Sequence, residues 1–133
     1  MNITLIQLLL KLKNASLARK EIVIIKYNKS CLDLLKLLYI EGFIQSFNIQ
    51  TIDSPFVKKH LQISITLRYF YNKPIFKDLK IVSKPSYVKY LKLKDLCKIV
   101  DKKSVLFLST NKGLLTSLDC KKHKVGGTLL FIV

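Results

Sequence analysis

The chain of 133 residues is predicted to fold as an α/β protein of the α+β kind, built from two small lobes. In segment 3–17 the apolar residues recur at helical spacing and cover one broad face. From Leu61 to Tyr69 apolar and polar residues alternate, which is typical of a half-buried antiparallel strand. After residue 86, short strand-like and helix-like segments are separated by turn residues. These observations predict a helix-containing N-terminal lobe and a mostly β C-terminal lobe.

The N-terminal lobe, residues 1–82, is predicted to run helix, strand, helix, strand, strand. The β-branched run within 21–27 predicts a buried strand. Ser30 is expected to cap the second helix, with Asp33 three residues later, and Gly42 to end it. The apolar side of this helix is predicted to comprise Leu34, Leu35, Leu38 and Tyr39. Strands over 43–52 and 61–69 are expected around a turn at 53–55, and 76–82 is expected to be extended.

Residues 83–86, Ser-Lys-Pro-Ser, are predicted to link the lobes, because proline favours an extended or turn conformation. The C-terminal lobe is then residues 87–133. Its predicted strands cover 87–91, 105–109 and 127–133, its predicted short helices cover 94–98 and 117–122, and a turn is expected at 111–113.

The charge of the chain predicts a polyanionic partner. Basic residues number 24 and acidic residues 8, a formal net charge of +16, and most of the excess falls after residue 53. Nucleic acid and an anionic membrane surface are the two partners that such an excess favours. A helix that crosses a membrane is excluded, because it needs about 20 uncharged residues and no such run exists. The basic residues are lysines except for Arg19 and Arg68, a composition typical of AT-rich genomes.

The sequence gives little support for an enzyme active site or a metal-binding site. The cysteines Cys31, Cys97 and Cys120 are odd in number and far apart, which favours a reducing compartment. Cys120 and His123 supply two zinc ligands where a structural site needs four. Ser109, Asp119 and His123 could form a triad, but no nucleophile elbow is present. We therefore predict no enzyme, no metal and no cofactor, with a small hydrolase centred on Ser109 or Cys120 as a rival.

Two polar segments near the C-terminus have the residue types that contact RNA. One is Ser109 to Gly113, Ser-Thr-Asn-Lys-Gly, and the other is the basic run from Lys121 to Lys124 that leads to Gly126. Short hydroxyl and amide side chains beside glycines let the backbone approach sugar and phosphate, and the lysines supply the electrostatic attraction. The alternative is an ordinary polar turn, a solvated charge run and a tight start to a strand.

Four blocks of the sequence resemble, in order and spacing, the small-subunit ribosomal protein eight family. They are Leu12-Lys13-Asn14-Ala15, Glu41-Gly42-Phe43-Ile44, Ile81-Val82-Ser83-Lys84-Pro85, and the more specific block from Leu108 to Thr116 that is followed by Lys124-Val125-Gly126-Gly127. The resemblance covers essentially the whole chain. It implies a non-enzymatic structural constituent of the small ribosomal subunit that binds a helical element in the central domain of the small-subunit rRNA and acts early in assembly.

The resemblance also implies where RNA binds. Principal contacts are expected in the C-terminal lobe, at Ser109, Thr110, Asn111, Lys112, Gly113, Gly126 and Gly127. The neighbouring candidates are Thr116, Lys121, Lys122, Lys124 and Thr128, and secondary contacts are expected at Lys84, Lys13 and Asn14. The implied partners are rRNA and neighbouring small-subunit proteins, with no membrane and no small-molecule substrate.

The sequence departs from the family pattern at three positions. Thr128 replaces a glutamate, Val133 a tryptophan and Asn111 a serine. This divergence and the AT-type composition predict a mitochondrial ribosome, with plastid and bacterial ribosomes as alternatives. Since no import segment is recognisable, an organellar protein is expected to be organelle-encoded or already processed. A generic basic module that binds other RNA or an anionic membrane by charge alone remains the rival account.

Overall fold

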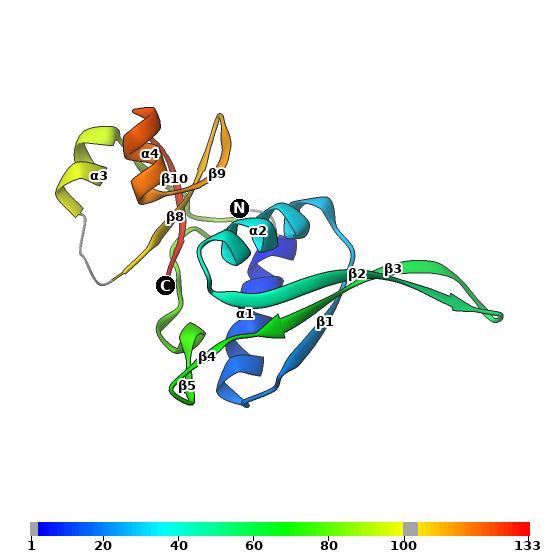
Figure 1. The fold of residues 1–133 in the computed structure, drawn as a ribbon. Coiled ribbons are helices and arrows are strands. Elements are labelled where there is room, and N and C mark those ends of the chain that lie inside the picture. The colour runs from blue at the N-terminus through cyan, green and yellow to red at the C-terminus, as the bar shows by residue number, and fades with distance from the viewer. Residues whose placement is uncertain (1–2, 100–103) are drawn as a thin grey trace. The chain divides into compact units, whose positions relative to one another are not determined.

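The computed structural model describes residues 3–99 and 104–133, which form two compact units. One unit comprises residues 7–77, and the other comprises the described residues from 78 onward together with residues 3–6. Figure 1 shows the mixed helix and strand content of both, which confirms the predicted α+β class. The division at 83–86 stays a prediction. In the described part of the chain, no helix is long and apolar enough to cross a membrane.

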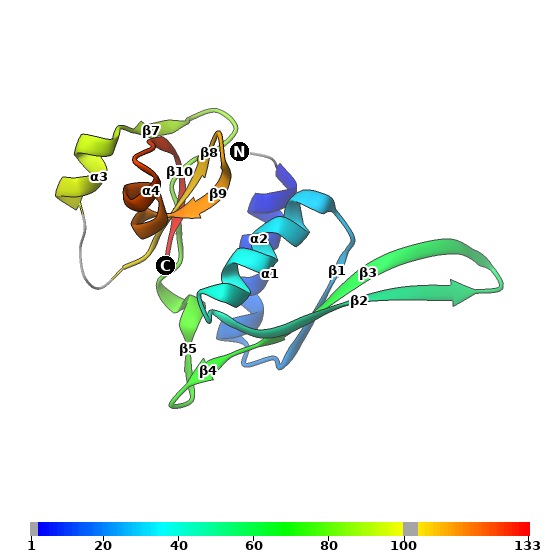
Figure 2. The same ribbon diagram turned by 45° about the horizontal axis from the view of Figure 1, so that its top comes forward.

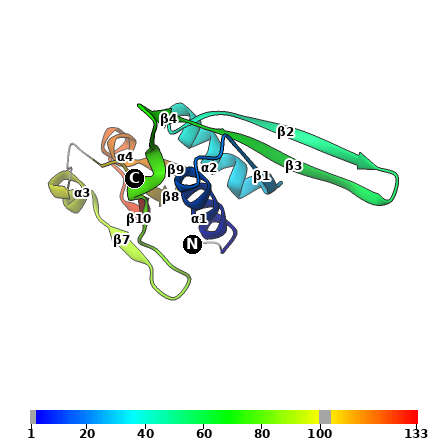
Figure 3. The same cartoon turned by 90° about the horizontal axis from the view of Figure 1, so that it is seen from below.

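The unit of residues 7–77 has the predicted order of elements. It contains α1 (Ile3–Leu17) from residue 7 onward, then β1 (Ile22–Lys26), α2 (Lys29–Ile40), β2 (Ile44–Ser54) and β3 (Val57–Leu67), followed by a small hairpin of β4 (Tyr69–Phe70) and β5 (Lys73–Pro74). The strands β1, β3 and β2 form an antiparallel sheet in that order, so β3 is central and β1 is an edge strand. The β2–β3 hairpin extends well beyond the end of β1 (Figures 1 and 3).

The prediction of a fully buried first strand is wrong. Along β1 the side chains alternate, with Val23 and Ile25 buried and the side chains of Ile22 and Ile24 55% and 50% exposed. The sheet therefore buries one face only, and a run of consecutive β-branched residues can arise in a strand that has one solvent-facing side.

Two details of α2 also differ from expectation. Asn28, not Ser30, caps the helix, because its backbone is still extended and its side chain accepts a hydrogen bond from the Ser30 N–H at 2.9 Å. Tyr39 is 52% exposed instead of buried, and its ring packs edge-on against Phe47 with centroids 6.0 Å apart. Gly42 follows the helix at φ 80°, which confirms it as the residue that ends the helix.

The segment predicted to be extended over 76–82 is a 3₁₀ turn, η1 (Ile75–Asp78), followed by the short strand β6 (Lys80–Ile81). The turn places the Phe76 ring, which is fully buried, 6.3 Å from the ring of Phe43. Before it, Tyr71 and Asn72 both have positive φ angles and connect β4 to β5, a conformation that two-residue hairpin loops favour.

The second unit is a curled antiparallel sheet with two short helices (Figure 2). After β6 it contains β7 (Lys89–Leu91), α3 (Leu93–Ile99), β8 (Leu106–Thr110), β9 (Gly113–Thr116), α4 (Ser117–His123) and β10 (Gly127–Ile132). The last strand, β10, is central, with β8 on one side and both β6 and β7 on the other. The predicted strands and helices are confirmed in this unit, whereas β9 was not predicted.

The two faces of this sheet carry different side chains. A cluster around Leu96 of α3 and Cys120 of α4 packs on Leu108 and Leu129 of the sheet. The opposite face carries the rings of Phe107 and Phe131, which are in register on β8 and β10 and stack with centroids 4.5 Å apart. Since residues two apart in a strand share a face, Ser109 continues the face that begins at Phe107.

Candidate nucleic-acid interface

Three polar side chains form a row across one end of the C-terminal sheet. Thr128 of β10 is in register with Tyr90 of β7 on one side and with Ser109 of β8 on the other. Residues directly opposite one another in antiparallel strands share a face, so their three hydroxyl groups lie along one surface. Ser109 is exposed, Thr128 is half-buried and Tyr90 is 62% exposed. Sequence reasoning missed Tyr90, which only the pairing of β7 with β10 brings into this row.

The turn beside this row is held by a threonine hydroxyl. Thr110 and Gly113 are paired across a two-residue loop formed by Asn111 and Lys112. The Thr110 hydroxyl donates to the Gly113 carbonyl at 2.9 Å and accepts from the Lys112 N–H at 3.2 Å. Its one proton is therefore already used within the loop. Asn111 and Lys112 are both exposed at the tip, so Thr110 fixes the loop that presents them.

The paired glycines are explained by close backbone packing. A Cβ on Gly127 would lie 2.5 Å from the Ser109 carbonyl oxygen and 2.7 Å from the Thr110 methyl carbon. A Cβ on Gly126 would lie 2.8 Å from the Leu91 carbonyl oxygen. Both glycines thus let β10 begin between the ends of β7 and β8, and Gly127 itself is buried. The packing of these strands therefore requires glycine at both positions, whether or not a ligand is bound.

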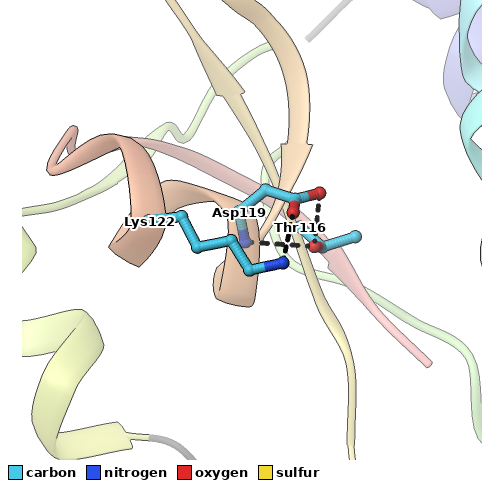
Figure 4. Close-up of polar contacts among 3 residues, drawn as sticks. All are labelled: Thr116, Asp119 and Lys122. Atoms are coloured by element: carbon cyan, nitrogen blue, oxygen red, sulfur yellow. Dashed lines mark hydrogen bonds and ion pairs between the residues drawn. The ribbon is translucent and has the colours of Figure 1, made fainter.

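The helix α4 begins at a threonine cap. Thr116 is extended and buried, and its hydroxyl contacts the Asp119 N–H at 3.5 Å and the Asp119 carboxylate at 3.1 Å. The same carboxylate lies 3.7 Å from the Lys122 ammonium (Figure 4). The Lys122 side chain is 76% exposed, so this ion pair contributes little to stability. Thr116 and Asp119 therefore serve the helix start, and Lys122 keeps an outward-facing charge.

Basic residues gather at the other end of α4. Lys121, Lys122 and His123 occupy its last turn, where positive charge complements the helix dipole. Lys124 follows with φ 53° and ψ 44°, a left-handed conformation that glycine adopts more readily, and its N–H donates back to the helix. Lys122 and Lys124 are exposed and Lys121 is half-buried.

The segment predicted as a linker contains a buried hydroxyl. Ser83 is fully buried, and its hydroxyl donates to the Leu129 carbonyl and accepts from the Lys89 N–H at 3.4 Å. Lys84 and Tyr87 exchange backbone hydrogen bonds at 2.8 and 3.0 Å around a turn, and both are exposed. Ser83 thus ties the turn to β7 and β10, and the turn presents Lys84. Sequence reasoning gave Ser83 no such role.

The remaining candidate contacts, Lys13 and Asn14, belong to the unit of residues 7–77. Both lie on α1, where Asn14 is exposed and Lys13 is half-buried. They are therefore not part of the row formed by β7, β10 and β8, and a contribution to RNA binding stays a prediction.

The chemistry that a hydrolase or a zinc site would need is not assembled in the described residues. The Asp119 carboxylate contacts Thr116 and Lys122. It therefore does not form the hydrogen bond to His123 that a Ser109–His123–Asp119 triad would need. Cys120 is fully buried, and burial, followed by the charge of Asp119, raises the pKa of its thiol. Within residues 3–99 and 104–133, no group of three histidine, cysteine or acidic residues could hold a metal ion.

The fold and this surface define a small, basic α+β protein that offers an exposed polar sheet end with lysines around it. Comparison with known protein families shows the family to which this protein belongs. The family model of ribosomal protein S8 matches residues 4–133, and the chain belongs to this family of non-enzymatic ribosomal proteins.

Relatives from several kinds of organism support the assignment. The chain is 36% identical over 115 residues to small ribosomal subunit protein uS8m of Acanthamoeba castellanii, covering 85% of this chain and 84% of that protein. It is 33% identical over 129 residues to uS8 of Pseudomonas aeruginosa, covering 97% and 95%. It is 31% identical over 127 residues to uS8c of Bigelowiella natans, covering 96% and 95%. These identities are similar, so they support the family without distinguishing a mitochondrial, bacterial or plastid ribosome.

Proposed function

We propose that this chain is a structural constituent of the small ribosomal subunit and binds small-subunit rRNA through the end of its C-terminal sheet. The observation that carries the proposal is the row of Tyr90, Thr128 and Ser109 beside the Asn111–Lys112 turn. Hydroxyl and amide groups on a rigid sheet suit contacts to ribose and phosphate, which recognise RNA by shape. Family membership makes rRNA the RNA in question.

The candidate residues divide into two roles. The exposed ones contact RNA, namely Ser109, Asn111, Lys112, Gly113, Lys122, Lys124 and Lys84, joined by the half-buried Lys121 and Thr128. Thr110, Thr116, Gly126 and Gly127 act by holding the loop, the helix start and the strand in place, because their polar groups or their missing side chains are used within the protein. The lysines supply the salt-dependent part of the affinity and the row supplies its specificity.

The finer assignment follows the resemblance. We infer that the bound element is helical, lies in the central domain of the small-subunit rRNA, and is bound early in assembly. We also infer a mitochondrial ribosome, since lysine-rich, arginine-poor composition of this kind is typical of AT-rich organelle genomes and one relative carries the name uS8m. Organelle fractionation tests the location, and recovery outside mitochondria would contradict it.

Sedimentation separates this function from binding by charge alone. A ribosomal constituent is expected to travel with the small subunit through a density gradient and to remain there at moderate salt, where nonspecific electrostatic binding weakens. A generic polyanion binder would leave the particle as salt rises. Ser109→Ala in the row and Ser86→Ala in an exposed turn are a matched pair, and only the first should reduce incorporation in competition with the unaltered chain.

A further inference from the structure

A second exposed surface lies in the other unit, along the free edge of β1. A groove of about 770 Å³ runs between this strand and the outer side of α1. The exposed apolar residues that line it are Leu10, Ile22 and Ile24, which are 45%, 55% and 50% exposed. Ile22 and Ile24 direct their side chains to the open face of the sheet, opposite the buried Val23 and Ile25, and Leu10 lies on α1. Exposed apolar side chains that flank a free sheet edge suggest that another chain can cover them.

The hydrogen bonding of β1 shows which backbone groups face this groove. Leu67 N–H donates to the Glu21 carbonyl and Tyr27 N–H donates to the Leu61 carbonyl, so Glu21 and Tyr27 direct their backbone groups toward β3. In an antiparallel ladder this direction alternates along the strand. The N–H and C=O groups of Ile22, Ile24 and Lys26 therefore point away from β3, toward the free edge.

One of these groups has a substitute partner. The Lys11 ammonium donates to the Ile24 carbonyl at 2.6 Å, reaching across from α1. A lysine at this place covers one acceptor and discourages indiscriminate pairing of the edge. The bond is exposed, so it can exchange for the N–H of an arriving strand. The released ammonium is then free to meet a carboxylate.

We propose that this groove binds an extended, acidic segment of a partner protein, which adds to the sheet as a strand beside β1. Strand addition uses the free backbone groups of an edge, and side-chain pockets beside the edge select the sequence. The alternation of β1 suits a segment whose apolar side chains lie beside Ile22 and Ile24 on the open face of the sheet, while its other side chains point toward α1 and Lys11. Among the described residues that line the groove, Lys11 and Lys20 are charged and both are basic, which favours carboxylates on the segment.

The same features disfavour two other occupants. A second copy of this chain would bring its own Lys11 and Lys20 to the groove and a net charge of +16 to the complex, so like charges would oppose pairing. RNA offers no N–H and C=O ladder to match a strand edge. This inference concerns a protein partner of the N-terminal unit and stands apart from the RNA surface of the C-terminal sheet.

The test uses two fluorescent ten-residue peptides and the full chain at roughly physiological salt. One peptide alternates valine and glutamate, and the other has the same charge but a proline in place of one central valine. Fluorescence anisotropy should show the first binding at least tenfold more tightly, about 1.4 kcal/mol. Binding should also shift the backbone amide NMR signals of Ile22, Ile24 and Lys26. Equal affinity for the two peptides would overturn the proposal, since charge alone would then explain binding.

Variants of the edge make the test specific. Ile24→Pro removes an N–H that faces the groove and no ladder bond to β3, so it should abolish the difference between the peptides. Ile24→Thr keeps the N–H and should preserve the difference. If Ile24→Pro does not fold, Lys11→Glu serves instead: it should weaken the valine–glutamate peptide at least fivefold and the proline peptide less, so that the preference falls. A preference between the two peptides that survives Ile24→Pro, or Lys11→Glu where that variant is used, would overturn the proposal. Displacement of the peptide by structured RNA would also overturn the proposal. Concentration-dependent self-association of the chain through β1 would overturn it as well.

Discussion

Gly127 begins β10 directly against Thr110, and a Cβ at Gly127 would lie 2.7 Å from the Thr110 methyl carbon. This close approach brings β10 and β8 together at the end of the sheet where Ser109 and Thr128 are in register. The polar row and the glycine are thus parts of one arrangement. A change at either residue should act on RNA binding through the shape of the sheet.

Gly127→Ala should destabilise the protein and weaken RNA binding together. The added methyl group would also lie 2.5 Å from the Ser109 carbonyl oxygen, which is backbone and cannot turn aside. Overpacking of this kind costs roughly 1–3 kcal/mol of unfolding free energy. Urea denaturation measures the loss. Adding Thr110→Ser, which removes the clashing methyl group, should restore part of it, and no restoration would mean that the backbone contact alone is limiting.

Thr110→Val should loosen the turn that presents Asn111 and Lys112. It removes the hydroxyl that joins the Gly113 carbonyl to the Lys112 N–H, an exposed pair of bonds worth about 0.5–1.5 kcal/mol in stability. Thr110→Ser keeps the hydroxyl and should behave like the unaltered protein. Denaturation and RNA binding of the two variants should be compared. If Thr110→Ser loses RNA affinity and Thr110→Val does not, the methyl group and not the hydroxyl is what matters.

Substitutions at Lys124 should separate its backbone conformation from its charge. Its left-handed backbone favours glycine, so Lys124→Gly should raise stability by about 0.5–1 kcal/mol, whereas Lys124→Ala should not. Both variants lose one charge and should lower the slope of log affinity against log salt by about one. Thermal melting and a salt titration distinguish these effects. An unchanged salt slope in both would remove Lys124 from the RNA-contacting set.

The stability of the fold should fall in alkaline solution. Burial raises the pKa of the Cys31 and Cys120 thiols above the ordinary value of 9.0, with the Asp119 charge adding to the effect at Cys120. The unfolded chain therefore loses these protons first, so their contribution is complete below pH 9 and declines as pH rises above it. Melting temperatures between pH 7 and 10 should show the decline. Cys120→Ala should flatten it relative to Cys97→Ala, which alters an exposed cysteine.

Much of the fold could be predicted because local signals and tertiary packing agree. The helix over Ile3–Leu17 and the alternation in β3 are examples, since one apolar face is enough to define each. The failures have physical causes. The burial of β1 was overestimated because four consecutive β-branched residues do not show that one sheet face is open, and Ser30 looked like a helix cap although Asn28 already had the extended backbone that a cap needs.

The candidate site was predicted only in part for a similar reason. Its residues on one continuous loop, Ser109 to Gly113, could be found from residue type and from the family resemblance. Tyr90 and Ser83 could not, because the first joins the site through strand pairing across the sheet and the second through a buried hydroxyl that contacts β10. Sequence spacing also could not show that Thr110 and the paired glycines are used within the protein.

The central claim is specific binding of small-subunit rRNA by the C-terminal sheet, and competition binding at roughly physiological salt tests it most directly. The affinity of the full chain for central-domain small-subunit rRNA would be compared with its affinity for an unrelated structured RNA of equal length. We expect a preference of at least a hundredfold, about 2.7 kcal/mol, that Ser109→Ala reduces and Ser86→Ala does not. Equal affinities that fall together as salt rises would contradict the account and leave a protein that binds RNA by charge alone.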